Sequence, residues 1–231
     1  VTAHFMRAID AGRAARLGTD GAGESTLRRV VAGLGIAQRG RVRLFDVDVT
    51  EALPHDRVAD GLSLVEGGRA TFPTLTVEEN LRVGPRSARR DRQAMACRVD
   101  EVLDRFPELV PHLDLPAGTL SGGLQQMLAL GRTLVGRPRL LLVDELSLGL
   151  APAVVQRLLA VVRELNDDGV TVVVVEQSVN VALSLAHTAH VLERGRIRHS
   201  GPAADLAVQP DLFRAVFLGG RADAPTLLGM A

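Results

Sequence analysis

The stretch at residues 17–27, LGTDGAGESTL, constrains the fold more than any other part of the chain. Its glycines and the pair Ser25 and Thr26 follow the frame G-x-x-x-x-G-K-[ST], in which a glycine-rich loop joins a strand to a helix. Such a loop turns successive backbone N–H groups toward an anion at the start of the helix. The frame therefore predicts a strand, a phosphate-binding loop and a helix, in that order.

One position breaks the frame, because Glu24 stands where the lysine belongs. A charge pair at about 4 Å and an effective dielectric near 20 is worth on the order of 4 kcal/mol, so a carboxylate there repels phosphate strongly. All 27 basic residues are arginine, and no lysine elsewhere in the chain can replace the missing one. The residues expected to bind ATP in this frame are Gly18, Gly21, Ala22, Gly23, Glu24, Ser25 and Thr26.

Composition limits the class of protein. The 231 residues are 46% hydrophobic, enough for one large α/β domain or a domain with a subdomain. The 27 basic residues balance 27 acidic ones, so charge does not favour nucleic acid or anionic lipid as a partner. Cys97 is alone, and no apolar run approaches 18 residues. We expect a cytoplasmic chain that does not span the membrane.

The rest of the chain alternates between strand and helix patterns. Strands are predicted before the phosphate loop, at 39–50 with a turn near its end, at 140–143 and at 170–175, followed by a hairpin turning at Arg194 and Gly195. Helices are predicted at 25 to about 33–35, from a capping box at Thr76, and at 89–106, 124–134, 152–165 and 179–186. A mostly parallel sheet with an inserted helical section follows from this order.

Asp144 and Glu145 end the apolar strand at 140–143. Taken alone, an acidic pair at a strand end is more often ordinary polar capping. Open α/β sheets bind ligands at the carboxyl ends of their strands, and a phosphate loop lies upstream. Asp144 is then suited to Mg²⁺ and Glu145 to polarising an attacking water.

A third motif, Leu120 to Gly123, reads LSGG and precedes the helix at 124–134. Ser121 can cap that helix, and Gly122 and Gly123 let a ligand approach its N–H groups. For four residues alone, a simple helix cap is the more frequent explanation. Its position between the helical section and LLLVDE favours a contact with a ligand instead.

In combination, these motifs resemble the ATP-binding cassette (ABC) family along nearly the whole chain. The segments LTVEENL at 75–81, QQMLALGRTL at 125–134, LLLVDELSLGLAP at 140–152, VVEQS at 174–178 and VLERGRI at 191–197 resemble one group within it. That group comprises the ATP-binding subunits of bacterial importers for branched-chain amino acids and related amides or urea. The resemblance implies an α/β P-loop NTPase fold with ATP-binding core at 1–73 and 136–231 and a helical subdomain at 74–135.

The resemblance also implies roles for single residues. Residues 18–26 would form the Walker A loop, with Ser25 and Asp144 holding Mg²⁺. Glu145 would be the catalytic base, and Gln177 would take the switch position. Ser121, Gly122 and Gly123 would contact ATP on an opposing cassette. The implied partners are a second cassette and membrane-spanning permease subunits, without nucleic acid, on the inner face of the cell membrane.

Several positions depart from the pattern of that group. Besides Glu24, Thr19 and Asp20 replace the usual Pro-Asn of the loop, and Leu146 replaces the proline after the catalytic glutamate. Gly67 stands where a Gln or Glu would sense the γ-phosphate. The aromatic residue that stacks on adenine is also absent at the front of the chain.

Two other functions stay open on the sequence alone. The departures at the phosphate loop fit a degenerate cassette that hydrolyses ATP weakly or not at all and acts as a structural or regulatory partner in a mixed dimer. A non-transport ABC protein acting on nucleic acid is disfavoured by the single cassette and the balanced charge.

Overall fold

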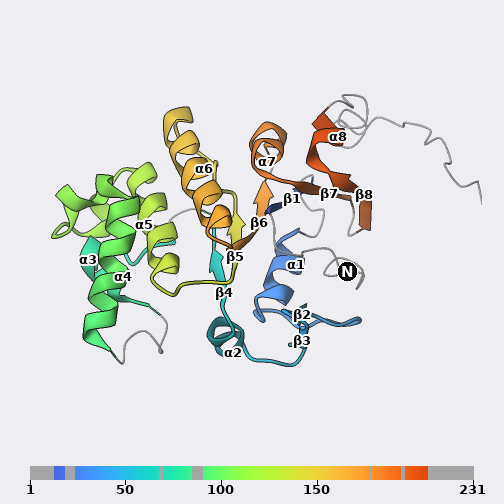
Figure 1. Cartoon of the computed structure of the whole chain (residues 1–231), viewed down its shortest axis with the longest axis horizontal. Coiled ribbons are helices and arrows are strands. Elements are labelled where there is room, and N and C mark those ends of the chain that lie inside the picture. The colour runs from blue at the N-terminus through green and yellow to red at the C-terminus, as the bar shows by residue number, and fades with distance from the viewer. Residues whose placement is uncertain are drawn as a thin grey trace, which may run out of the picture.

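A computed structural model describes residues 13–18, 24–67, 70–84, 91–176, 178–193 and 196–207. Its centre is a six-stranded sheet with the order β4-β5-β6-β1-β7-β8 (Figure 1). Neighbouring strands from β4 to β7 are parallel, and only β8 runs antiparallel to its neighbour. The mostly parallel sheet is therefore confirmed. The strands are β1 (Arg13–Gly18), β4 (Leu62–Val65), β5 (Leu140–Asp144), β6 (Thr171–Glu176), β7 (Thr188–Glu193) and β8 (Arg196–Pro202).

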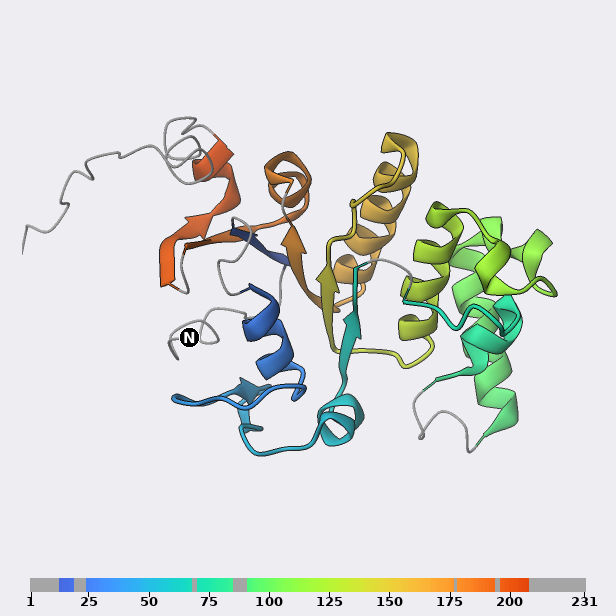
Figure 2. The ribbon, with the colours of Figure 1, turned by 180° about the vertical axis from the view of Figure 1, so that it is seen from behind.

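Helices cover both faces of this sheet, as the two opposite views of the ribbon show (Figures 1 and 2). Helices α6 and α7 lie on one face and α1 on the other, while α3, α4 and α5 gather at one end. The helices are α1 (Glu24–Val31), α2 (Pro54–Ala59), α3 (Val77–Arg82), α4 (Arg92–Arg105), α5 (Gly122–Leu134), α6 (Pro152–Asp167), α7 (Val179–Leu185) and α8 (Ala203–Ala207), with 3₁₀ segments η3 (Pro107–His112) and η4 (Ala117–Thr119).

The central strands divide the buried side chains into two cores. In β5, Leu141 and Val143 face one core while Leu140 and Leu142 face the other, as expected for alternating side chains in a strand. The large core joins this sheet face to α3–α7. The small core lies under α1 and includes Leu27, with only a few other helix residues. The two faces of the sheet are therefore unequally supported.

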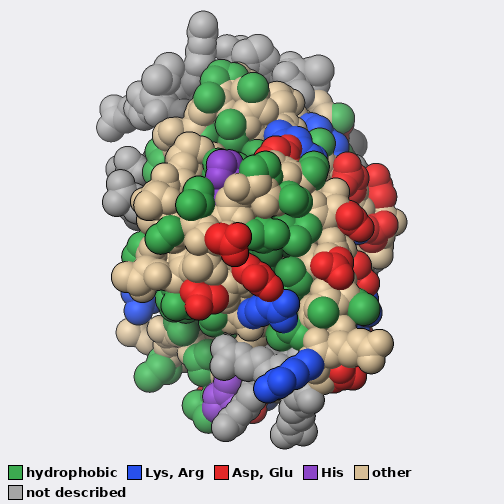
Figure 3. Space-filling model, turned by 90° about the vertical axis from the view of Figure 1, so that its left-hand side faces the viewer, with side chains coloured by type: hydrophobic (Ala, Val, Ile, Leu, Met, Phe, Trp, Pro, Cys, Tyr) green, Lys and Arg blue, Asp and Glu red, His purple; other side chains and the backbone are tan. Residues whose placement is uncertain are grey.

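The helical end is built by close packing of α3, α4 and α5. Gly131 of α5 lies against α4, and a Cβ placed there would be 2.8 Å from Val102 Cγ1. The predicted capping box at α3 is confirmed, because Thr76 Oγ1 accepts from Glu79 N at 3.1 Å and Glu79 Oε2 accepts from Thr76 N at 2.8 Å. Hydrophobic and acidic side chains share the outer surface at this end (Figure 3). The domain limits expected from the sequence stay a prediction.

The strand predicted at 39–50 is wrong as a single element. The structure has two short antiparallel strands, β2 (Arg43–Leu44) and β3 (Val47–Asp48). Phe45 and Asp46 form the turn between them with φ of 50° and 66°. Two consecutive left-handed residues make a tight hairpin turn, which residue alternation alone does not reveal.

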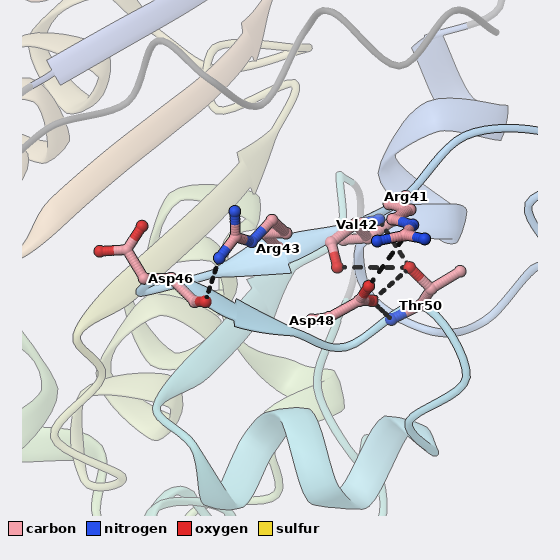
Figure 4. A network of polar contacts seen from close by, with 6 residues as sticks. All are labelled: Arg41, Val42, Arg43, Asp46, Asp48 and Thr50. Atoms are coloured by element: carbon pink, nitrogen blue, oxygen red, sulfur yellow. Dashed lines mark hydrogen bonds and ion pairs between the residues drawn. The ribbon is translucent and has the colours of Figure 1, made fainter.

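A polar network fastens the ends of this ribbon (Figure 4). Thr50 Oγ1 accepts from Val42 N at 2.9 Å and donates to Asp48 Oδ1 at 2.6 Å. The hydrogen bonds from the Thr50 side chain and backbone lower the pKa of the Asp48 carboxyl. The ribbon therefore stays closed where it leaves the small core.

Helix α2 and strand β4 are not among the predicted elements. Both are short, and α2 carries a buried arginine, Arg57, where a periodic pattern would need an apolar residue. The Arg57 guanidinium donates to four backbone oxygens, on Ala52, Val30, Val31 and Thr50, at 2.7 to 3.1 Å. Two of these are carbonyls at the end of α1, which lack partners within the helix. Arg57 thus anchors the helix that follows the phosphate loop.

Candidate nucleotide site

Three parallel strands bring their carboxyl ends to one edge of the sheet. Strand β6 lies between β1 and β5, with Leu17 beside Glu176 and Asp144 beside Val175. The end of β1 at Gly18 therefore lies near the acidic ends of β5 and β6. Such an edge is where open α/β sheets bind ligands.

The phosphate loop is described only in part. Gly18 ends β1, and Glu24, Ser25 and Thr26 begin α1, so the predicted order of strand, loop and helix is present. Gly21, Ala22 and Gly23 lie outside the described residues, as do the side chains of Glu24 and Ser25. Gln177, expected at the switch position, is also outside them. The roles assigned to these residues stay predictions.

Asp144 pairs with an arginine side chain of the same chain. Arg28 of α1 forms an ion pair with it, between Nη1 and Oδ2, and the two side chains are only 11% and 16% exposed. The sequence places magnesium on Ser25 and Asp144, but a guanidinium already covers one carboxylate oxygen of Asp144. The ion pair leaves Asp144 Oδ1 outside the contact, so the coordination of Mg²⁺ by Ser25 and Asp144 stays a prediction.

Glu145 follows Asp144 in an unusual backbone conformation, with φ of 46°. Its N–H donates to Val175 O at 2.9 Å, which holds it beside β6. The next residue, Leu146, is fully buried in the large core. A proline there would push Glu145 toward extended backbone, so the leucine at this position permits the left-handed turn.

Gly67 lies directly against this turn. A Cβ at Gly67 would be 2.9 Å from Glu145 Cβ and 3.1 Å from Asp144 O. Only a residue without a side chain fits so close to a backbone oxygen. The backbone of Gly67 therefore meets Glu145 where the related group has a Gln or Glu side chain.

Glu176 holds the loop that follows Glu145. Its carboxylate accepts hydrogen bonds from Ser147 N at 2.9 Å and Ser147 Oγ at 2.8 Å. Burial raises the pKa of the Glu176 carboxyl, the Ser147 hydrogen bonds oppose that shift, and the charge of Glu145 adds to it. Glu176 is thus a buried acid that ties β6 to the loop after β5.

The LSGG motif, Leu120 to Gly123, lies at the start of α5. Ser121 caps the helix by accepting from Leu124 N at 3.4 Å, and Ser121 and Gly122 are exposed. Gly123 is packed more tightly, since a Cβ there would lie 2.9 Å from Val154 Cγ1. The cap is confirmed, and contact of these residues with nucleotide stays a prediction.

The sequence did not predict the contacts that Arg28, Glu176 and Gly67 make at the sheet edge. Arg28 lies one helical turn after Ser25, and that spacing on the loop helix was available in the sequence. Glu176 ends the apolar run at 171–175, the same pattern that identifies Asp144. The contact of Gly67 with Glu145 joins distant segments and had no local signal.

Comparison with known proteins identifies the family. The model of the ABC transporter family matches residues 9–147 of the chain. The chain belongs to the ABC transporter family. It is 42% identical over 205 residues to the high-affinity branched-chain amino acid transport ATP-binding protein BraG of Pseudomonas aeruginosa, covering 88% of this chain and 86% of that protein. It is 34% identical over 204 residues to the probable branched-chain amino acid transport ATP-binding protein LivF of Archaeoglobus fulgidus, covering 88% and 85%.

Solved structures agree on the fold. A nucleotide-free ATP-binding cassette from an ABC transporter matches with a TM-score of 0.77 and 25% identity, covering 87% of this chain and 85% of that one. The ADP conformation of the cassette MJ1267 matches with a TM-score of 0.79 and 24% identity, covering 91% and 89%. The predicted P-loop NTPase fold is confirmed.

Two features are absent from the described part of the chain. None of the helices in the described part of the chain has the length and apolar character needed to cross a membrane. Among the same residues, no cluster of three or more His, Cys, Asp or Glu side chains could hold a metal ion.

Proposed function

We propose that this chain is the ATP-binding subunit of an ABC importer for branched-chain amino acids or related solutes, coupling ATP binding and hydrolysis to transport. The observation that carries the proposal is the shared sheet edge, where the phosphate-loop strand β1 ends one strand away from Asp144, with β6 between them. Similarity to BraG along 88% of the chain supports the choice of solute class. Transport of a particular solute depends on other subunits.

The residues at this edge divide the work in the proposed site. The backbone N–H groups at the start of α1 bind the phosphates. Glu145 polarises the attacking water. The backbone N–H of Glu145 donates to Val175 O, which holds Glu145 beside β6. Glu176 and Ser147 position the loop that follows Glu145.

We further infer that the chain works with a second cassette and with permease subunits at the cytoplasmic face of the membrane. Ser121, Gly122 and Gly123 would contact the nucleotide held by the opposing cassette. Exposure of Ser121 and Gly122 supports that role. The helical end, with hydrophobic and acidic side chains on its outer surface (Figure 3), is the proposed permease contact.

The relatives are named as transport ATP-binding proteins, and they give no support to the hypothesis of a degenerate cassette. Ser25 and Asp144 would hold Mg²⁺ in the proposed site, with Asp144 Oδ1 outside its ion pair with Arg28. Nucleic acid is left out of the proposed function, given the balanced net charge.

The test is ATP affinity of the purified chain beside a Glu24→Lys variant, measured by calorimetry. We expect the natural chain to bind ATP and Glu24→Lys to bind at least about tenfold more tightly, because repulsion becomes attraction. Glu51→Lys makes the same charge change at an exposed position away from the loop and should leave the affinity unchanged. Absence of ATP binding to both the natural chain and Glu24→Lys would refute the proposed function. Equal binding would show that Glu24 does not face the phosphates.

A further inference from the structure

The backbone conformation of Glu145 depends on the residue that follows it. Its φ of 46° lies in the left-handed region, which residues other than glycine seldom adopt. Leu146 comes next and is fully buried in the large core. Proline at position 146, as in the related group, would drive Glu145 toward extended backbone. Leucine at this position is therefore a condition for the observed turn.

The left-handed turn places the side chain of Glu145 over Gly67. A Cβ built on Gly67 would lie 2.9 Å from Glu145 Cβ and 3.2 Å from Glu145 Oε2. The carboxylate of Glu145 thus occupies space that a side chain at position 67 would need. Asp144 O, at 3.1 Å from the same built atom, closes that space from the backbone side. A larger residue does not fit at position 67 while Glu145 keeps this conformation.

Glycine is required at position 67 for its small size and not for a special backbone conformation. The φ of Gly67 lies outside the left-handed region, so the limit on a larger residue is one of space. Gly149 shows the opposite case, with φ of 71° and no atom within 4 Å of its built Cβ. The atoms that restrict position 67 belong to Asp144 and Glu145.

We propose that Gly67 and Leu146 act together as positioning residues for Glu145. Leu146 permits the left-handed turn, and Gly67 leaves the space in which that turn places the carboxylate. Two departures from the pattern of the related group then form one linked change, with Glu145 at its centre. The inference rests on the proposed function, in which Glu145 polarises the attacking water.

The first experiment adds a side chain at position 67. Gly67→Ala should lower kcat for ATP hydrolysis by the purified chain at least about tenfold, because the methyl group displaces the Glu145 carboxylate. ATP affinity, measured by calorimetry, should stay within about threefold of that of the natural chain. Gly35→Ala is the matched control, since a Cβ there would meet its nearest atoms at 3.6 to 3.7 Å. It should leave both quantities unchanged.

The second experiment tests the link between the two positions. Leu146→Pro and Gly67→Gln should each lower kcat at least about tenfold, the first through the backbone of Glu145 and the second through its side chain. The double variant has the residues typical of the related group, and its kcat should exceed that of either single variant at least about threefold. Leu146→Ala shortens the same buried side chain without constraining Glu145 and should keep kcat within about threefold.

An unfolding measurement tests the contact if Leu146→Pro does not fold. Gly67→Ala should lower the urea midpoint of the natural chain. In a Glu145→Gly background that shift should be at most about half as large, because glycine has no Cβ to meet the new methyl group. Equal shifts in the two backgrounds would overturn the link between Gly67 and Glu145.

The outcomes separate this inference from the proposed function. Unchanged kcat in Gly67→Ala would overturn the inference and leave the proposed function standing. A double variant no more active than the single variants would do the same. A natural chain that neither binds nor hydrolyses ATP would refute the proposed function, whereas the unfolding measurement would still test the link between Gly67 and Glu145.

Discussion

The two faces of the central sheet are supported by cores of different size. On the face toward α5, α6 and α7, the large core includes fully buried residues such as Leu128, Leu141 and Leu158. On the face toward α1, the small core is supplemented by a buried guanidinium, Arg57. The sheet face toward α1 therefore depends on the polar contacts of one side chain in addition to apolar packing.

This difference bears on where substitutions can change function. Hydrophobic stabilisation scales with buried apolar area, so many residues share it in the large core. The small core has fewer apolar residues to share that stabilisation, so the hydrogen bonds of Arg57 contribute a larger part of its stability. The ion pair between Arg28 and Asp144 at the sheet edge adds to that dependence.

The largest expected effect is on the side of the small core. Arg57→Ala would remove the guanidinium donor from the carbonyl groups of Val30 and Val31 at the end of α1, with Gly33 N still donating to Val30 O, and should lower the free energy of unfolding by about 3 kcal/mol. Urea denaturation measures the change. Arg41→Ala, at a side chain that is 80% exposed, should stay within about 0.5 kcal/mol. Equal effects of the two substitutions would contradict the difference between the faces.

A smaller effect is expected where the helical end is packed. Gly131→Ala brings a methyl group to 2.8 Å from Val102 Cγ1 and should cost about 1 to 3 kcal/mol, partly offset by the helix preference of alanine. The same urea experiment applies. In a Val102→Ala background the cost should disappear, because the clashing methyl is gone. An unchanged cost in that background would place the strain elsewhere.

The smallest effect is a pH dependence at the joint between β5 and β6. Since burial raises the pKa of Glu176 in the folded chain, the folded state holds that proton more tightly than the unfolded state. The stability from Glu176 is fully present below the usual value of 4.5 and is lost as pH rises through the folded-state pKa.

Glutamine does not titrate, so Glu176→Gln should gain stability relative to the natural chain as pH rises above about 4.5. Thermal unfolding of both proteins across pH 4 to 8, at the same ionic strength, measures this relative gain. A relative stability that does not vary with pH would show that Glu176 titrates alike in the folded and unfolded states.

Local patterns in the sequence were sufficient for the elements with strong signals. The apolar runs that became β5 and β6, the capping box at Thr76 and the cap at Ser121 each depend on residues close together in the chain. The order of the phosphate loop and the acidic strand end predicted the family. The hairpin at Phe45 and the short elements α2 and β4 were missed because they depend on backbone conformation or on distant partners.

By itself, the sequence determined the α/β class, the placement of Gly18 and Asp144 at strand ends, and the charge reversal at Glu24, because these follow from residue type and spacing. Only the tertiary structure decided that Arg28 meets Asp144, that Gly67 lies against Glu145 and that Arg57 caps α1. Each of these contacts joins segments far apart in the chain. Their geometry depends on how the helices pack on the sheet, which no local pattern encodes.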